Sequence, residues 1–154
     1  MSTDIYGFIE ARHPLAREDW YEGDPWTAVS IPLHPLYDDQ DQESFACLFG
    51  IRDRLGWPPV AAGRGLPDDV SGPVRAEYED TARLDAAVHG CTWVSWAELR
   101  DLDLTARPAA AGRVALTRLD LLGPETGWAA VFEVMRALAR RFGPDGVRLI
   151  VWFD

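Results

Sequence analysis

"VRLIVWF", residues 147 to 153, is an almost uninterrupted apolar run near the end of this 154-residue chain. A short run rich in β-branched and aromatic residues is typical of a strand that is buried on both faces. We therefore expect a central strand here, preceded by the turn Gly143-Pro144-Asp145-Gly146. Other strands must lie on either side of it.

Two candidate partner strands lie near the N-terminus. Residues Asp4 to Arg12 alternate in part, with Ile5, Ile9 and Ala11 on one face, and with the other face formed by Asp4, Tyr6, Phe8, Glu10 and Arg12. The segment Trp26 to Leu33 repeats the pattern, and Pro32 within it indicates an edge or an end.

Helix signals are spread over the middle of the chain. The apolar spacing of residues 44–55 predicts a helix that stops at Gly56. Ser71 is a plausible N-cap for a second helix, with Pro73 in its first turn and an end near Val88. Residues Ser95 to Glu98 have capping-box spacing and predict a short helix through Leu102.

The last part of the chain adds a strand and a long helix before the central strand. We expect a strand from Arg113 to Leu122. Apolar residues then recur at helical spacing from Trp128 to Phe142 and predict a strongly amphipathic helix. The resulting order predicts a single α+β domain, 1–154, with a mixed or antiparallel sheet covered by about four helices.

Composition restricts the classes of function. The net charge is −10 with only 15 basic residues, which argues against direct binding of nucleic acid. The chain has no lysine, so Schiff-base and P-loop lysine chemistry are excluded. No apolar run is long enough for a membrane span, and the first residues lack signal-peptide features. We expect a cytoplasmic protein whose Cys47 and Cys91 are reduced core thiols.

The loop RGLPDDVS, residues 64–71, is the most distinctive polar segment. Arg64, and also Arg52 after the first helix, are placed to aim a guanidinium at a carboxylate or a phosphate. We prefer a bridge within the loop, from Arg64 to Asp68 or Asp69. Gly63 and Gly65 are too few and too close to form a phosphate-binding loop.

Carboxylates from separate segments form a second candidate cluster. Asp4 and Glu10 share a strand face, Asp68 and Asp69 precede a helix, and Asp154 follows the central strand. Carboxylates gathered beside aromatic residues could act as a general acid and base or hold a divalent ion. The simpler interpretation, which we favour, is a helix cap at Asp69, a solvated Asp68, and strand-end charges at Asp4 and Asp154.

Histidine and cysteine offer little chemistry. His89 and Cys91 could form a base and a nucleophile, but members of such pairs usually come from distant segments. We expect His89 to form a hydrogen bond at a helix end. No ligand spacing indicates a metal site, and no cofactor is expected.

Seven tryptophans are present, and Trp20, Trp57 and Trp96 lie in or beside polar segments. Exposed aromatics among acids are typical of protein-contact surfaces, although burial under loops explains them equally well.

Five segments together resemble a family of uncharacterised proteins from bacteria and their phages: TDIYGFIEAR, LFGIRDRLG, RGLPDDVS, HGCTWVSWAEL and VRLIVWFD. The family typically opens with a Gly-Cys-Asp-Ile-His motif. Here Thr3 and Tyr6 stand where the family often has cysteine and histidine, so a function that rests on that histidine does not carry over. The resemblance implies a self-contained fold and brings no known reaction.

Two hypotheses of function follow. The first is an acidic protein-interaction module whose partner is another protein, for example a basic one, in a phage or mobile-element context. The second is a small ligand-binding protein or hydrolase that uses Arg64, Asp68, Asp69 and His89. The second hypothesis requires these four side chains to meet in one concave site.

Overall fold

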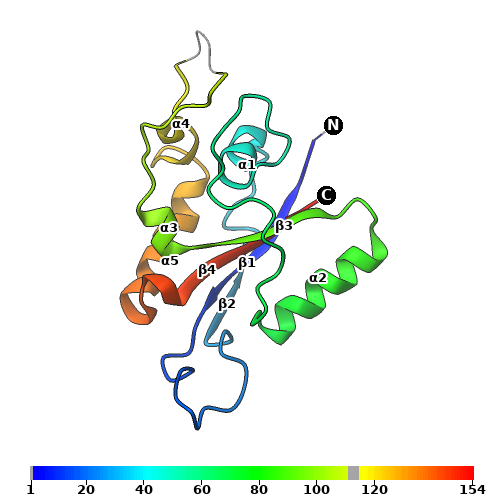
Figure 1. Cartoon of the computed structure of the whole chain (residues 1–154), viewed down its shortest axis with the longest axis vertical. Coiled ribbons are helices and arrows are strands. Elements are labelled where there is room, and N and C mark those ends of the chain that lie inside the picture. The colour runs from blue at the N-terminus through cyan, green and yellow to red at the C-terminus, as the bar shows by residue number, and fades with distance from the viewer. Residues whose placement is uncertain (1, 111–114) are drawn as a thin grey trace.

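The apolar segment 147–153 forms the strand β4 (Val147–Phe153), which lies inside a four-stranded sheet (Figure 1). The structure is a computed structural model that describes residues 2–110 and 115–154. The strand order is β2-β1-β4-β3, with β1 (Ile5–Ala11), β2 (Val29–Pro32) and β3 (His89–Ser95). Every neighbouring pair of strands is antiparallel. The expected central strand is therefore confirmed, as is the edge position of the strand that contains Pro32.

Helices cover both faces of this sheet. Figure 1 shows α2 on one side, and the other four helices on the opposite side. Their bounds are α1 (Gln42–Phe49), α2 (Gly72–Leu84), α3 (Trp96–Arg100), α4 (Arg118–Leu122) and α5 (Trp128–Phe142), and a 3-10 turn, η1 (Pro144–Gly146), joins α5 to β4. The expected α+β class is confirmed.

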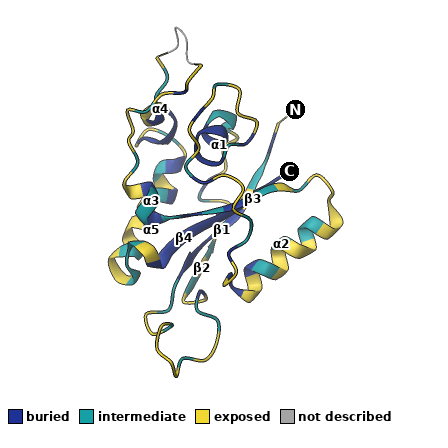
Figure 2. Cartoon of the chain, viewed as in Figure 1, coloured by how far each residue is buried: buried dark blue, intermediate teal, exposed yellow. Residues whose placement is uncertain are grey.

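Burial on two faces explains the continuous apolar pattern of β4. Leu149, Val151 and Phe153 belong to the large core under α1 and α5, whereas Ile150 and Trp152 belong to a smaller core under α2. Successive side chains of a strand point to opposite faces of the sheet. A strand that lies between two layers of helices therefore needs apolar residues on both of its faces. All seven residues of β4 are buried, as the dark blue ribbon in Figure 2 shows.

Three helix predictions are confirmed at their starts. The Ser71 hydroxyl accepts a hydrogen bond from the Val74 N–H at 3.4 Å and caps α2. Ser95 and Glu98 form both hydrogen bonds of a capping box at the start of α3. The helix α5 has the expected bounds, and its apolar stripe packs on the large core.

Three helices end earlier than the sequence predicts, and one of them is α3, which stops at Arg100 and does not reach Leu102. The helix α1 stops at Phe49 because Gly50 adopts a left-handed conformation at φ 70° and donates its N–H back to Ala46. The helix α2 stops at Leu84. Residues His89 to Ser95 then form β3, a strand that the sequence analysis did not anticipate.

The expected strand over residues 113–122 is wrong for its second half. Arg118 to Leu122 form the helix α4, and Arg113 and Val114 lie outside the described residues. The cause is local, because the Asp120 carboxylate accepts from the Thr117 N–H at 2.8 Å and stabilises a helix start. In the described part of the chain, no helix is long and apolar enough to cross a membrane.

Candidate functional site

An open depression of about 670 Å³ lies at the end of the sheet where β4 begins. Segment 64–69, the end of β3 and the start of α3 surround it. The lining residues are Trp26, Arg64, Leu66, Pro67, Asp68, Asp69, Trp93, Ser95, Glu98, Asp145 and Arg148. Three candidates from the sequence, Arg64, Asp68 and Asp69, therefore meet in one concave surface.

A buried arginine forms the base of this depression. Arg148 Nη1 donates to Asp69 Oδ1 at 2.8 Å, and its Nε and Nη2 donate to Glu10 Oε2 at 3.1 and 3.0 Å. The Glu10 side chain is fully buried and the Arg148 side chain is 5% exposed. The guanidinium also stacks 3.6 Å from the centre of the Trp26 ring. This arrangement compensates a buried cation with two carboxylates and an aromatic face.

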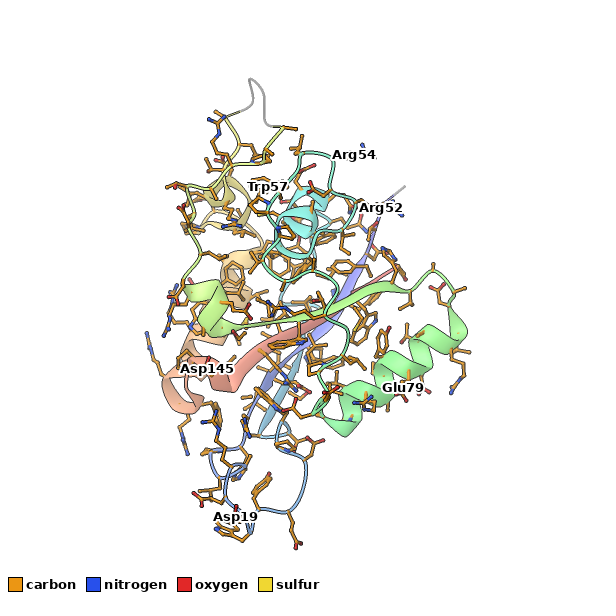
Figure 3. The ribbon with its side chains drawn as sticks, in the orientation of Figure 1. Asp19, Arg52, Arg54, Trp57, Glu79 and Asp145 are labelled. Carbon is orange, nitrogen blue, oxygen red and sulfur yellow. The ribbon has the colours of Figure 1, made fainter. Side chains whose placement is uncertain are left out.

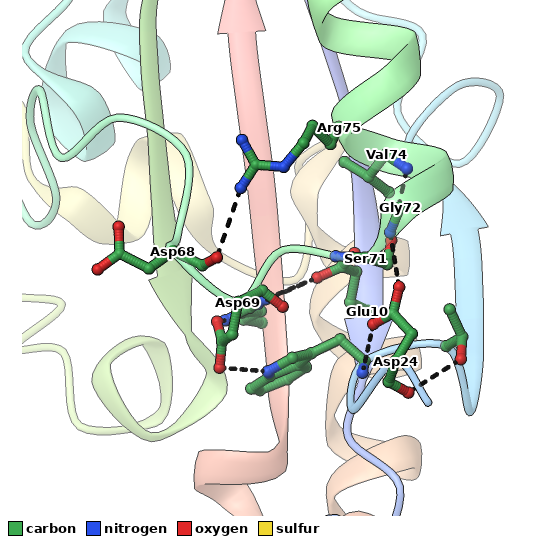
Figure 4. Close-up of polar contacts among 11 residues, drawn as sticks. Glu10, Asp24, Asp68, Asp69, Ser71, Gly72, Val74 and Arg75 are labelled. Carbon is green, nitrogen blue, oxygen red and sulfur yellow. Dashed lines mark hydrogen bonds and ion pairs between the residues drawn. The ribbon is translucent and has the colours of Figure 1, made fainter. Parts of the chain in front are cut away.

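The same network fixes segment 64–71 to the sheet. Trp26 Nε1 donates to Asp69 Oδ2 at 2.8 Å, and the Ser71 N–H donates to Glu10 at 3.2 Å (Figure 4). Burial alone would raise the pKa of Asp69, but the hydrogen bonds from Arg148 and Trp26 outweigh it and hold that pKa below its ordinary value. Asp69 is thus ionised and bound, and it does not cap α2 as the sequence suggested.

Asp68 differs from its neighbour Asp69. Figure 4 shows its carboxylate directed away from the network, while its backbone carbonyl accepts from Arg75 at 3.4 Å. The side chain accepts no hydrogen bond from the described residues and is exposed. The expectation of a solvated Asp68 is confirmed.

Arg64 does not pair within its own loop, so that prediction is wrong. Its guanidinium forms a two-pronged pair with Glu98, at 2.8 and 2.6 Å, and lies 4.9 Å from the centre of the Trp93 ring. Gly63 and Gly65, at φ 63° and 75°, turn the loop toward β3 and α3 and away from the two aspartates. The hydrogen bond from Arg64 lowers the pKa of Glu98.

The remaining candidates lie at the opposite end of the sheet. His89 begins β3 opposite Phe153, and its Nδ1 lies 2.9 Å from the Ala87 carbonyl, so it is not at a helix end as expected. Asp4 pairs through its backbone with Asp154. Arg52 lies in the turn after α1, and Figure 3 shows it far from Asp145 in the depression. The four residues of the hydrolase hypothesis therefore do not meet.

The surroundings of Cys91 disfavour the thiolate that a His89–Cys91 pair would need. Burial raises the pKa of its thiol to about 11. Neither Cys47 nor Cys91 forms a disulfide; Cys47 is buried as expected, whereas Cys91 is only partly buried. Within residues 2–110 and 115–154, no three metal-ligating side chains converge.

Arg148, Glu98 and Trp26 were not among the site residues predicted from the sequence. A signal for Arg148 was present, because a charged side chain inside a central strand requires a buried counter-ion. Glu10 lies within the other inner strand and was the natural candidate. Trp57 and Trp96 are core residues at 3% and 5% exposure, whereas Trp20 is 65% exposed.

Comparisons with protein-family models, with curated proteins and with solved structures found no match. The resemblance to the bacterial and phage family stays a prediction.

Proposed function

We propose that this protein is a protein-binding module whose partner presents a basic segment to the depression around Asp68 and Asp145. The observation that carries the proposal is the balance of charges in the lining. Both arginines there are already neutralised, Arg64 by Glu98 and Arg148 by Asp69 and Glu10. The carboxylates of Asp68 and Asp145 form no hydrogen bond or ion pair with the described residues, so acidic side chains outnumber basic ones in the lining of the depression.

Aromatic surface supports the same proposal. Trp93 lines the depression and is half-buried, so part of its ring can contact a partner. The loop between β1 and β2 borders this surface, because the Asp24 carboxylate accepts from the Gly72 N–H at 2.6 Å. That loop carries the exposed Trp20 among Glu18, Asp19 and Glu22. Tryptophan and negative charge together favour arginine-rich partners, through cation–π contact and salt bridges.

The hydrolase hypothesis loses its support. Among the described residues, the depression contains no histidine or cysteine. Its one hydroxyl nucleophile, Ser95, is engaged in the capping box with Glu98. The resemblance to bacterial and phage proteins suggests a mobile-element context for the partner.

Affinity capture with charge-matched variants tests the proposal. The Asp68→Asn/Asp145→Asn pair removes the two unpartnered carboxylates, and Glu125→Gln/Glu133→Gln removes two exposed carboxylates near α5 as a control. We expect the wild type and the control to retain the same protein saturably at low salt. Retention should fall at high salt and in the depression variant. A partner retained equally by both variants, or no saturable partner, would contradict the proposal.

A further inference from the structure

A second hollow, of about 270 Å³, lies beside the turn that joins α5 to β4. One wall comes from the residues after β1, and the other comes from the end of α5 and from η1. Its lining residues are Arg12, His13, Pro14, Arg17, Phe142, Gly143, Pro144, Asp145 and Gly146. Nothing in the proposed function uses this hollow, apart from the shared residue Asp145.

Arg12 supplies the first positive charge of this hollow. Its Nε is buried and has no hydrogen-bond acceptor. No ion pair joins its guanidinium to a described residue, and its one ring contact is with Trp26, at 6.0 Å. A buried donor without an acceptor is costly, and the cost is larger for a charged group. In a protein with net charge −10, an arginine left without a carboxylate is unexpected.

Two further donors line the same hollow. His13 Nδ1 accepts a hydrogen bond from the Leu15 N–H at 3.1 Å, which places the ring proton on Nε2. Arg17 is exposed and forms no hydrogen bond or ion pair with the described residues. Among the described residues, the lining thus brings two arginines and one histidine together with a single carboxylate, Asp145.

We infer that this hollow binds a phosphate dianion, either free or as the terminal group of a phosphate monoester. Arginine guanidinium groups match tetrahedral oxyanions in geometry and charge, and an imidazole N–H adds a third donor. Among the residues that the structure describes, Asp145 is the one carboxylate in the lining, and it opposes the anion. The site accommodates one phosphate and is not a polyanion surface, because acidic residues dominate the chain as a whole.

Calorimetric titration with inorganic phosphate at constant ionic strength tests this inference. We expect saturable binding to one site. Arg17→Gln, at an exposed position, should weaken binding about tenfold or more, because it removes a charged hydrogen-bond donor. Arg12→Gln should do the same. The control Arg83→Gln removes an equal charge from the exposed end of α2 and should bind as the wild type does.

Asp145→Asn should change the affinity for phosphate in the opposite direction to the arginine variants, which makes it the most specific test of the site. Removing the opposing carboxylate should tighten phosphate binding several-fold, an outcome that misfolding cannot produce. A parallel titration with N-acetyl-phosphoserine amide separates the two sources, since a site for free phosphate binds only the inorganic ion. Absence of saturable binding by both probes, unchanged affinity in Arg17→Gln, or an equal loss in Arg83→Gln would overturn the inference.

Discussion

Arg148 donates a hydrogen bond of 2.8 Å to Asp69, although the two residues are 79 positions apart in the chain. One belongs to the strand β4 and the other to the loop that precedes α2. The same guanidinium holds the fully buried Glu10 of β1. A single side chain therefore joins two strands of the sheet to the distinctive RGLPDDVS loop.

Replacing this arginine should be among the most damaging single changes in the chain. Arg148→Met leaves Glu10 buried without a counter-charge, so we expect a loss of about 3 to 5 kcal/mol in the free energy of unfolding. Unfolding in urea measures this difference in the free energy of unfolding between the variant and the wild type. The control Arg83→Met, at an exposed ion pair, should change stability by no more than about 0.5 kcal/mol. The double variant Glu10→Leu/Arg148→Met should recover most of the loss.

Asp69 should make stability depend on pH in the acidic range. Its pKa in the folded protein is lower than in the unfolded chain, so the unfolded state takes up its proton first as the pH falls. The stabilisation from Asp69 is complete above about pH 4, the unfolded value, and is lost as the pH falls through the folded value.

The variant Asp69→Asn isolates this contribution. It should be less stable than the wild type at pH 7, and the difference should shrink between about pH 4 and pH 2. Urea midpoints at several pH values check this expectation. A constant difference across that range would show that Asp69 does not titrate as described.

Both cysteines should be unreactive in the folded protein. Burial raises the pKa of Cys47 and of Cys91 to about 11, so about one thiol in a thousand is ionised at pH 8. Labelling with an aromatic disulfide reagent should therefore be slow in buffer and complete in urea. Rapid labelling of one thiol in buffer would mean that its segment opens readily.

Gly7 should not tolerate a side chain. It pairs with Val151, and a Cβ at this position would overlap the backbone carbonyl of Ile150. Gly7→Ala should destabilise the protein by about 3 kcal/mol or more, because the β1–β4 pairing must shift. Gly63→Ala is the matched control: its φ is 63° but nothing lies near its Cβ, so a cost of about 1 kcal/mol is expected. Thermal unfolding of both variants and of the wild type compares the two losses of stability.

Local patterns predicted much of the fold. The segments of β4 and α5 are long and have a clear pattern of apolar residues. In both segments the secondary-structure propensity and the pattern of burial therefore predict the same element. The strand β3 was missed because Gly90, at φ 68°, interrupts its short β pattern, and its pairing with β4 shifts between His89 and Thr92. The helix α4 was missed because its five residues carry little periodicity and depend on the Thr117–Asp120 cap.

The candidate site was less predictable because its contacts are long-range. The Glu10–Arg148 pair forms only in the antiparallel register that places these residues opposite each other. The Arg64–Glu98 pair depends on two left-handed glycines that turn the loop away from its own aspartates. Arg64, Asp68 and Asp69 could be identified as candidates from their residue types. The residues with which they interact could be identified only from the tertiary structure.

The position of β4 has a consequence for how the protein is made. It is the last described element along the chain, yet it lies between β1 and β3, both synthesised earlier. Until residues 147–153 leave the ribosome, those two strands have no partner between them and expose unpaired backbone edges. Their pairing then depends on contacts between distant positions, which form slowly. Before β4 emerges, these exposed edges can pair with strands of other chains, so the incomplete chain is more prone to aggregate than the finished one.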